Sequence, residues 1–190
     1  MGQKAKIAIA IILVVISFLI FFNVWQQSDR HGVYSSDSGV KPLENTTNRE
    51  GRFNIIGDDS CKESTNSAIN FLKDKSPKDY QMALKYLGTI ECIDSGSVVY
   101  PWQNPPIFRV GRETINTGIF WYASVLVHEA CHIELYSKGL TWKGEGPEKM
   151  CLEIQYDALV KIGANKDLLD YARGIINSEW WKNAPEGSWY

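Results

Sequence analysis

The amino-acid sequence predicts an α+β fold. We expect a domain that is mainly helical, with a small sheet preceding its central helix, and one N-terminal transmembrane helix. Three observations lead to this prediction. An apolar run stands at residues 7–25, helical periodicity fills most of the chain after residue 60, and two short β-favouring runs precede the most apolar helix. With 190 residues, the chain has room for one domain and an appendage.

Residues 7–25 are expected to cross a membrane. The run holds 19 residues, and at about 1.5 Å per residue it spans roughly 28 Å, close to the thickness of a bilayer core. Lys4 and Lys6 precede it, so the positive-inside rule places residues 1–6 in the cytoplasm and the chain after residue 25 on the other side of the cell membrane. No small-residue cleavage site follows the run, which favours an uncleaved signal anchor over a cleaved signal peptide.

Residues 26–60 are rich in Ser, Asp, Asn and Gly and lack a sustained period, which is typical of a flexible linker. The folded domain is therefore expected to cover residues 61–190. The net charge is −2. Without an excess of basic residues, the sequence does not indicate nucleic-acid binding.

Two helices and two strands are expected before the central helix. Apolar residues at helical spacing predict a helix around residues 65–72, and Pro77 begins a second helix that ends at Gly88. Residues 97–100 and 107–110 are β-favouring runs separated by a proline-rich loop, so they predict two strands. An open edge of their sheet could pair with an extended peptide, or it could be covered; the sequence favours neither.

The central helix is expected from Gly118 to Lys138 and carries two of the three histidines. His128 and His132 are four residues apart, so both imidazoles lie on one face of the helix and can reach one metal ion. Zn²⁺ accepts neutral imidazoles and can leave one position open for water, for which Glu129 would be the general base. The alternative is a half-exposed polar face without metal. The apolar surroundings favour a buried site, in which polar groups need partners.

The third metal ligand is expected on the next helix, which begins at Pro147. No histidine follows His132, so this ligand should be a carboxylate. Glu153 and Asp157 share a helix face, so Glu153 could bind the metal while Asp157 accepts a hydrogen bond from a ligating histidine. Glu148 is the alternative third ligand, because the length of the intervening loop is not fixed by the sequence.

The histidine motif and the carboxylate pair that follows it resemble the gluzincins, the thermolysin-like branch of the zincin metallopeptidases. In size the chain is similar to their minimal members, and the resemblance covers residues 98–163. It implies a zincin-like fold and these roles: zinc binding by His128, His132 and Glu153, water activation by Glu129, and orientation of a histidine by Asp157. The sequence departs from the family pattern at Leu152, where an Asn often stands, and at Cys131 within the motif.

The expected function is hydrolysis of peptide bonds in a peptide or protein substrate. Zinc and Glu129 would activate the attacking water. Tyr156 and Arg109 are candidates for stabilising the tetrahedral oxyanion, although Tyr156 is equally suited to packing. The alternatives are a non-catalytic, membrane-tethered binding module with a structural zinc, and an interaction protein without metal. A structural site needs ligands but no base, and this sequence has the base.

Four cysteines follow the predicted anchor, which suits an oxidising compartment and permits three disulfide pairings. We expect Cys61 to pair with Cys92, and Cys131 with Cys151. The second disulfide would join the central helix to the helix after it. Metal binding by these cysteines is less favoured because no C-x-x-C spacing is present.

A last helix is expected after Asn165, which can cap it, and its apolar residues would cover the core. An aromatic-rich terminus follows, with Trp180 and Trp181. These indoles could pack on the domain, touch lipid or line the substrate cleft, and packing is the expected role.

Overall fold

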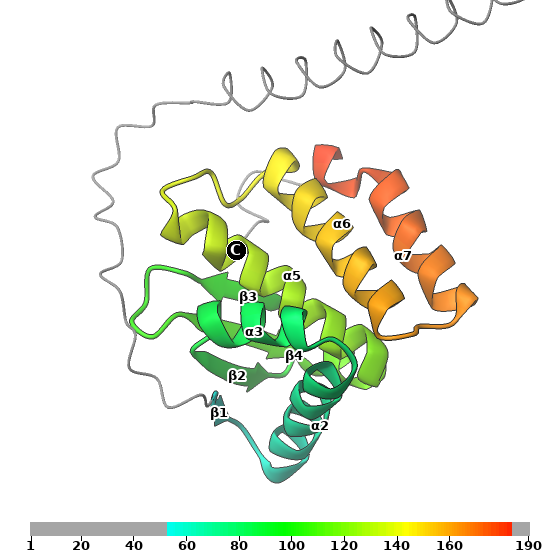
Figure 1. The fold of residues 1–190 in the computed structure, drawn as a ribbon. Helices are drawn as coiled ribbons and strands as arrows, with labels where there is room; N and C mark the ends of the chain where they lie inside the picture. Colours follow the sequence, from blue (N-terminus) through cyan, green and yellow to red (C-terminus); the bar gives the residue numbers. More distant parts are fainter. Residues whose placement is uncertain (1–52, 184–190) are drawn as a thin grey trace, which may run out of the picture. The chain divides into compact units, whose positions relative to one another are not determined.

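The computed structural model describes residues 53–183. The predicted cytoplasmic N-terminus, transmembrane helix and most of the predicted linker lie outside these residues. The described part has an α+β fold, mainly helical with one small mixed sheet (Figure 1). None of the helices within it is long and apolar enough to cross a membrane.

The helices and strands occur in an order close to the predicted one. They are β1 (Asn54–Ile56), α2 (Asp59–Lys75), α3 (Pro77–Tyr86), β2 (Thr89–Ile93), β3 (Ser97–Tyr100), β4 (Ile107–Gly111), α4 (Arg112–Asn116), α5 (Ile119–Ser137), α6 (Glu145–Lys161), α7 (Lys166–Ser178) and the 3-10 helix η1 (Trp180–Asn183). The predicted helices and both predicted strands are confirmed. Asn165 caps α7 as expected, because its side-chain oxygen accepts a hydrogen bond from the backbone of Leu168 at 2.9 Å.

The sheet has the strand order β1-β2-β4-β3. The pairs β1–β2 and β2–β4 are parallel, whereas β3 is antiparallel to β4 and forms an edge of the sheet. All the described strands precede α5, which confirms the expected position of the sheet. As the edge strand, β3 has one side without a partner strand among the described residues, and it contacts α5.

The predicted linker ends too late in the sequence. Residues 54–56 form β1 and α2 already begins at Asp59, so the folded domain starts before residue 61. The strand was missed because it is only three residues long and pairs with β2, whose Thr89 lies opposite Asn54. A parallel pairing at such sequence separation leaves no local hairpin signal.

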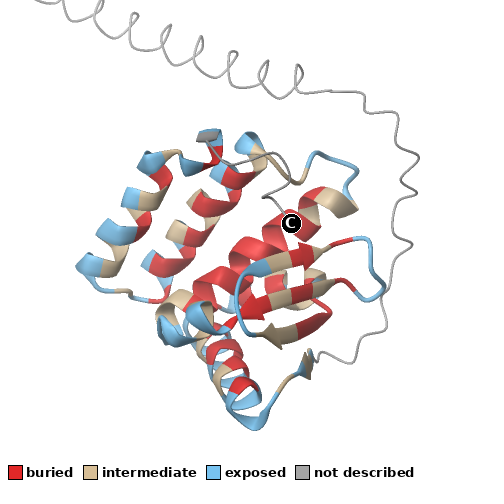
Figure 2. Ribbon diagram, turned by 180° about the vertical axis from the view of Figure 1, so that it is seen from behind, coloured by how far each residue is buried: buried red, intermediate tan, exposed pale blue. Residues whose placement is uncertain are grey.

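Helix α5 lies at the centre of the domain, between the sheet on one side and α6 on another (Figures 1 and 2). Of its 19 residues, 13 are buried, among them Tyr122 and Leu126. A helix that is enclosed nearly all round buries its polar side chains as well as its apolar ones. The helix stops at Gly139, whose φ of +68° lets Leu140 donate a hydrogen bond back to Leu135 at 3.0 Å.

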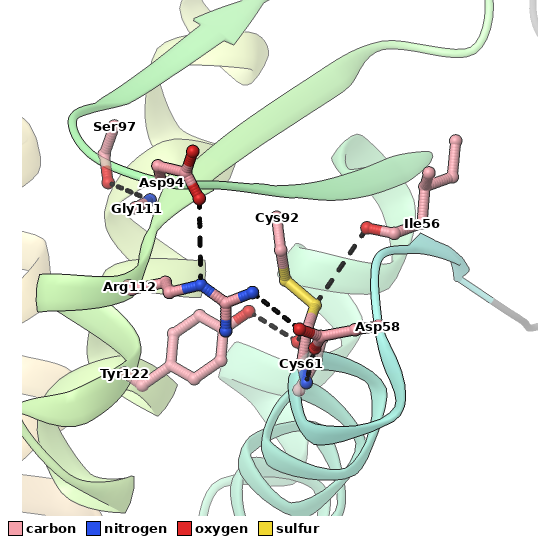
Figure 3. Close-up of a disulfide and its surroundings, with 10 residues drawn as sticks. Ile56, Asp58, Cys61, Cys92, Asp94, Ser97, Gly111, Arg112 and Tyr122 are labelled. Atoms are coloured by element: carbon pink, nitrogen blue, oxygen red, sulfur yellow. Dashed lines mark hydrogen bonds and ion pairs between the residues drawn. A yellow bond between two sulfur atoms is a disulfide. The ribbon is translucent and has the colours of Figure 1, made fainter.

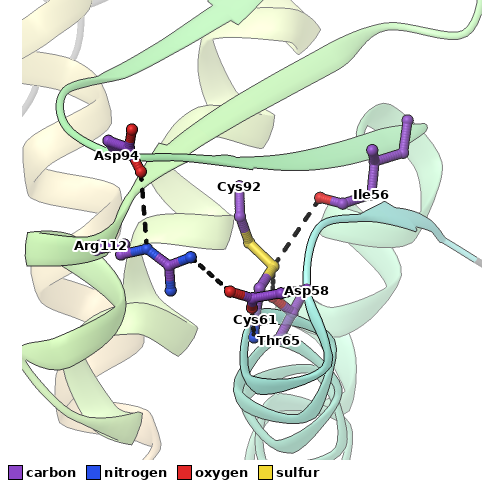
Figure 4. A network of polar contacts seen from close by, with 7 residues as sticks. All are labelled: Ile56, Asp58, Cys61, Thr65, Cys92, Asp94 and Arg112. Carbon is purple, nitrogen blue, oxygen red and sulfur yellow. Dashed lines mark hydrogen bonds and ion pairs between the residues drawn. A yellow bond between two sulfur atoms is a disulfide. The ribbon is translucent and has the colours of Figure 1, made fainter.

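The predicted disulfide between Cys61 and Cys92 is present and joins the first turn of α2 to β2 (Figure 3). Closing a loop of this length stabilises the fold by about 3–4 kcal/mol, mainly by restricting the unfolded chain. Asp58 caps α2 by accepting a hydrogen bond from the Cys61 backbone at 2.8 Å (Figure 4). Arg112 donates to the same carboxylate at 2.6 Å and holds the pKa of Asp58 below its usual value.

Candidate metal centre

Two histidine side chains from adjacent turns of α5 face one another. His128 and His132 are both buried, with Nε2 atoms 3.1 Å apart. The Nδ1 of His132 lies 2.6 Å from the backbone carbonyl oxygen of Trp142. A carbonyl can only accept a hydrogen bond, so Nδ1 of His132 carries the hydrogen and Nε2 is directed at His128. This is how a metal-binding histidine is commonly oriented.

Glu148, in the first turn of α6, completes the group. Its two carboxylate oxygens lie 3.6 Å from Nε2 of His128 and 3.4 Å from Nε2 of His132, and the side chain is buried. Two atoms bound to a tetrahedral zinc at about 2.0–2.1 Å each are about 3.3–3.4 Å apart. The nitrogen–nitrogen distance and the distance from each nitrogen to one of the two Glu148 oxygens are therefore each close to the separation of two ligand atoms on a zinc ion.

The predicted disulfide between Cys131 and Cys151 is also present and holds α6 against α5, with Cα atoms 5.6 Å apart. Cys131 directly precedes His132, and Cys151 lies three residues after Glu148. Residues three apart on a helix share a face, so the disulfide turns Glu148 towards the histidines. The amide of Gln155, one turn further along this face, donates to Ser124 of α5 at 3.2 Å.

The structure does not bring Glu153, the residue favoured from sequence as third ligand, to the histidine pair. Glu153 follows Cys151 by two residues, which rotates it by about 200° around α6, away from α5. Its carboxylate pairs with Arg173 of α7 at 3.1 Å, and its side chain is 44% exposed. Asp157 is exposed on the surface of the same helix, so it lies apart from the histidines too. Glu148, the alternative, occupies the expected position.

Neither candidate for stabilising the oxyanion lies at the histidine pair. Tyr156 packs under the Arg173 guanidinium, whose carbon is 3.9 Å from the ring centroid, and touches the apolar cluster around Leu152. Arg109, on β4, donates to Glu91 at 2.7 Å. Both side chains therefore have structural partners elsewhere.

Burial and mutual charge shift the ionisation of the group. Burial is the main cause that lowers the pKa of His128 to about 4, and His132 adds to it, so this imidazole is neutral. Burial also opposes charge on His132 and on Glu148, but their mutual attraction outweighs it, raising the pKa of His132 and lowering that of Glu148. Burial raises the pKa of Glu129 to about 7, within the range that suits a general base near neutral pH.

A cavity of about 200 Å³ opens over the histidine pair and Glu129. Its walls come from residues 97–99 of the edge strand β3, from Trp142 and Lys143 in the loop between α5 and α6, and from Trp180 of η1. Trp180 thus lines the cavity, whereas its neighbour Trp181 is buried against the domain. The loop residues reach the cavity because the chain turns back after Gly139 and α6 packs along α5.

The donor set fits zinc. Two imidazole nitrogens and one carboxylate, with a cavity beside them, are typical of catalytic sites that keep a fourth position open. One ligand atom each of His128, Glu129 and His132 lie within 4.8 Å of one another, so these three buried side chains also form a group that could hold a metal ion. Comparisons with known protein families, with characterised proteins and with solved structures found no match to this chain.

Proposed function

We propose that this chain is a zinc-dependent peptidase with a zincin-like fold of the gluzincin type. His128, His132 and Glu148 are the proposed ligands, and Glu129 is the general base. The observation that carries the proposal is the close approach of three side chains: the two Nε2 atoms are 3.1 Å apart, one Glu148 oxygen is 3.6 Å from that of His128, and the other Glu148 oxygen is 3.4 Å from that of His132. Each of these distances is close to the separation of two ligand atoms on a tetrahedral zinc. A purely structural site would need neither the buried acid beside them nor the cavity above them.

The proposed reaction is hydrolysis of a peptide bond. When bound, zinc polarises the substrate carbonyl and lowers the pKa of water towards about 7. Glu129 takes a proton from the attacking water and later delivers it to the leaving amine. The hydrogen bond of His132 to the Trp142 carbonyl fixes the orientation of that ligand, and the buried surroundings strengthen the electrostatic interactions of Glu129 with the reacting groups.

The edge strand β3 is the proposed docking site for the substrate backbone. Residues 97–99 line the cavity, and β3 pairs with β4 but with no other described strand. An extended peptide can add to such an edge through main-chain hydrogen bonds, which depend little on sequence. This would place one peptide bond of the substrate over the histidine pair.

We further propose that the chain is a single-pass membrane protein, held in the bilayer by residues 7–25, with its domain outside the cytoplasm. The two disulfides support an oxidising compartment. Mass spectrometry of an unreduced digest, with free thiols blocked in intact cells, should show Cys61 linked to Cys92 and Cys131 to Cys151. Free thiols at all four cysteines would contradict the location.

The direct test of the proposed activity is zinc content and peptide hydrolysis, measured on the purified full-length chain in detergent. We expect one zinc per chain and cleavage of a fluorogenic peptide library. A chelator should remove both, and stoichiometric zinc should restore both. Bound zinc without any cleavage would favour the binding module, whereas a metal-free chain of unchanged stability would contradict every zinc-based function.

A further inference from the structure

The three proposed zinc ligands come from two helices. His128 and His132 stand on adjacent turns of α5, so the helix itself fixes their spacing. Glu148 belongs to α6, and residues 138–144 separate the two helices in the sequence. The distance from the Glu148 carboxylate to the imidazoles therefore depends on how the first turns of α6 pack against α5. Metal–ligand distances tolerate a deviation of only about 0.2 Å, so this packing has to be closely fixed.

The first half of α6 has a small apolar cluster of its own near Glu148. Cys151 is buried there with Cys131 and Leu135 of α5, in a group that is separate from the main core. The next residue, Leu152, packs instead against α7 and η1, and only the second half of α6 contributes buried residues to the main core. At the end of α6 that carries the proposed ligand, the contact with α5 is therefore centred on the disulfide.

The other attachments of the start of α6 are weak. Its N-cap residue is Gly144, which offers no side chain to cap the amides of the first turn. Glu145 pairs with Lys182 of η1 at 3.9 Å, but both side chains are about half exposed, so this pair adds little. Gln155 donates a hydrogen bond to α5, but from two turns beyond Glu148. Without the disulfide, the first turns of α6 would be able to shift relative to α5.

The disulfide is adjacent to a proposed ligand on each helix. Cys131 directly precedes His132, and Cys151 follows Glu148 by three residues on the same helix face. The exposed fractions of the two cysteines are only 2% and 0%, so the bond is shielded from reductants once the domain has folded. A covalent bond this close to both ligands limits how far Glu148 can move from the histidines.

We propose that the disulfide between Cys131 and Cys151 positions the third ligand of the metal centre, and that the chain reaches its full zinc affinity only after this disulfide has formed. The inference rests on the proposed function and adds the order in which its site is assembled. The two thiols pass two electrons and two protons to an oxidant of the disulfide class, which is reduced to a dithiol. In a reducing cytoplasm the chain would lack this bond, so the active site would be completed only in an oxidising compartment.

The test compares two variants of the full-length chain in detergent. Cys131→Ala with Cys151→Ala removes the disulfide at the site, and Cys61→Ala with Cys92→Ala removes the disulfide between α2 and β2. Zinc affinity is measured by competition with a chromophoric chelator, at a temperature at which circular dichroism shows both variants to be folded. We expect zinc affinity to be about 10- to 100-fold weaker in the first variant, as for other groups that orient metal ligands, and unchanged in the second.

The second variant separates positioning of the ligand from general stability. Its cysteines are 31 residues apart, compared with 20 residues for the pair at the site. Because a longer closed loop restricts the unfolded chain more, loss of the disulfide between Cys61 and Cys92 should cost at least as much stability. Thermal unfolding of the metal-free variants measures both losses. If zinc affinity only followed stability, both variants would bind zinc equally weakly.

A measurement on the unaltered chain covers the case in which the first variant does not fold. If the disulfide raises zinc affinity by some factor, zinc must favour the disulfide over the two thiols by the same factor. The full-length chain is equilibrated in a glutathione redox buffer, with and without saturating free zinc held by a chelator, and its thiols are then blocked and counted by mass spectrometry. Zinc should raise the ratio of disulfide to dithiol about 10- to 100-fold at Cys131 and Cys151, and leave it unchanged at Cys61 and Cys92.

Equal zinc affinity in the two variants, whether high or low, would overturn the inference and leave the proposed ligands standing. A zinc effect of the same size on both disulfides would also overturn it, because zinc would then stabilise the whole fold rather than the link between α5 and α6. A chain with both disulfides closed that binds no zinc would overturn the proposed function, and this inference with it.

Discussion

Replacing Glu148 by glutamine should lower the affinity of the chain for zinc by more than about 100-fold, because even residues that only orient metal ligands contribute 10- to 100-fold. The change keeps the size of the side chain but removes the negative charge between the two Nε2 atoms, which lie 3.6 and 3.4 Å from its oxygens. Glutamine is also a much weaker zinc ligand than glutamate. The measurement is a competition titration with a chromophoric chelator.

Glu153→Gln is the matched control on the same helix. Its side chain is 44% exposed and pairs with Arg173, so the substitution should leave zinc affinity unchanged and cost little stability. The comparison separates the two carboxylates that the sequence offered as third ligand. If Glu153→Gln lost zinc and Glu148→Gln kept it, Glu153 and not Glu148 would be the third ligand.

Replacing Glu129 by glutamine should lower kcat by about 10²–10⁴-fold while zinc remains bound at one per chain, since the variant loses general-base catalysis but no ligand. Burial raises the pKa of Glu129 to about 7, so its carboxylate can both take up and release a proton near neutral pH. Glutamine has similar size but cannot accept a proton. Initial rates on the best-cleaved library peptide, together with metal analysis of the same sample, measure both effects.

Asp157→Asn is the control for this second prediction. The sequence suggested that Asp157 orients a histidine, yet the residue is exposed on α6. The substitution should therefore leave both kcat and zinc content unchanged. If Glu129→Gln removed the zinc as well, Glu129 would be a ligand and the proposed base would have to lie elsewhere.

The sequence was sufficient for those parts of the fold that depend on local pattern. The long apolar run around the two histidines predicted the central helix, and Gly139 predicted its end, because a positive φ after a helix favours glycine. The short parallel strand β1 could not be found this way, since its partner lies far along the chain. The strand β2 was missed although Ile90 and Cys92 alternate with polar neighbours, because Gly88 was interpreted only as the end of the preceding helix.

The histidine pair could be predicted from the sequence. For the third proposed ligand, the sequence offered Glu148 only as the alternative to Glu153. Glu153 was preferred because it stands four residues before Asp157, a pattern known from gluzincins. The expected disulfide contained the better signal: if Cys151 faces Cys131, then Glu148, three residues earlier, faces the same way and Glu153 does not. Helix geometry applied to the disulfide would have selected Glu148.

The most direct measurement is the zinc-edge anomalous difference map of crystals grown from the zinc-loaded chain. We expect one peak between the Nε2 atoms of His128 and His132, at about 2.0–2.1 Å from each, with a carboxylate oxygen of Glu148 at about 2.0–2.2 Å. Glu129 should lie beside the peak without binding it. A peak bound by Glu153, or the absence of any peak at the histidine pair, would contradict the proposed zinc site.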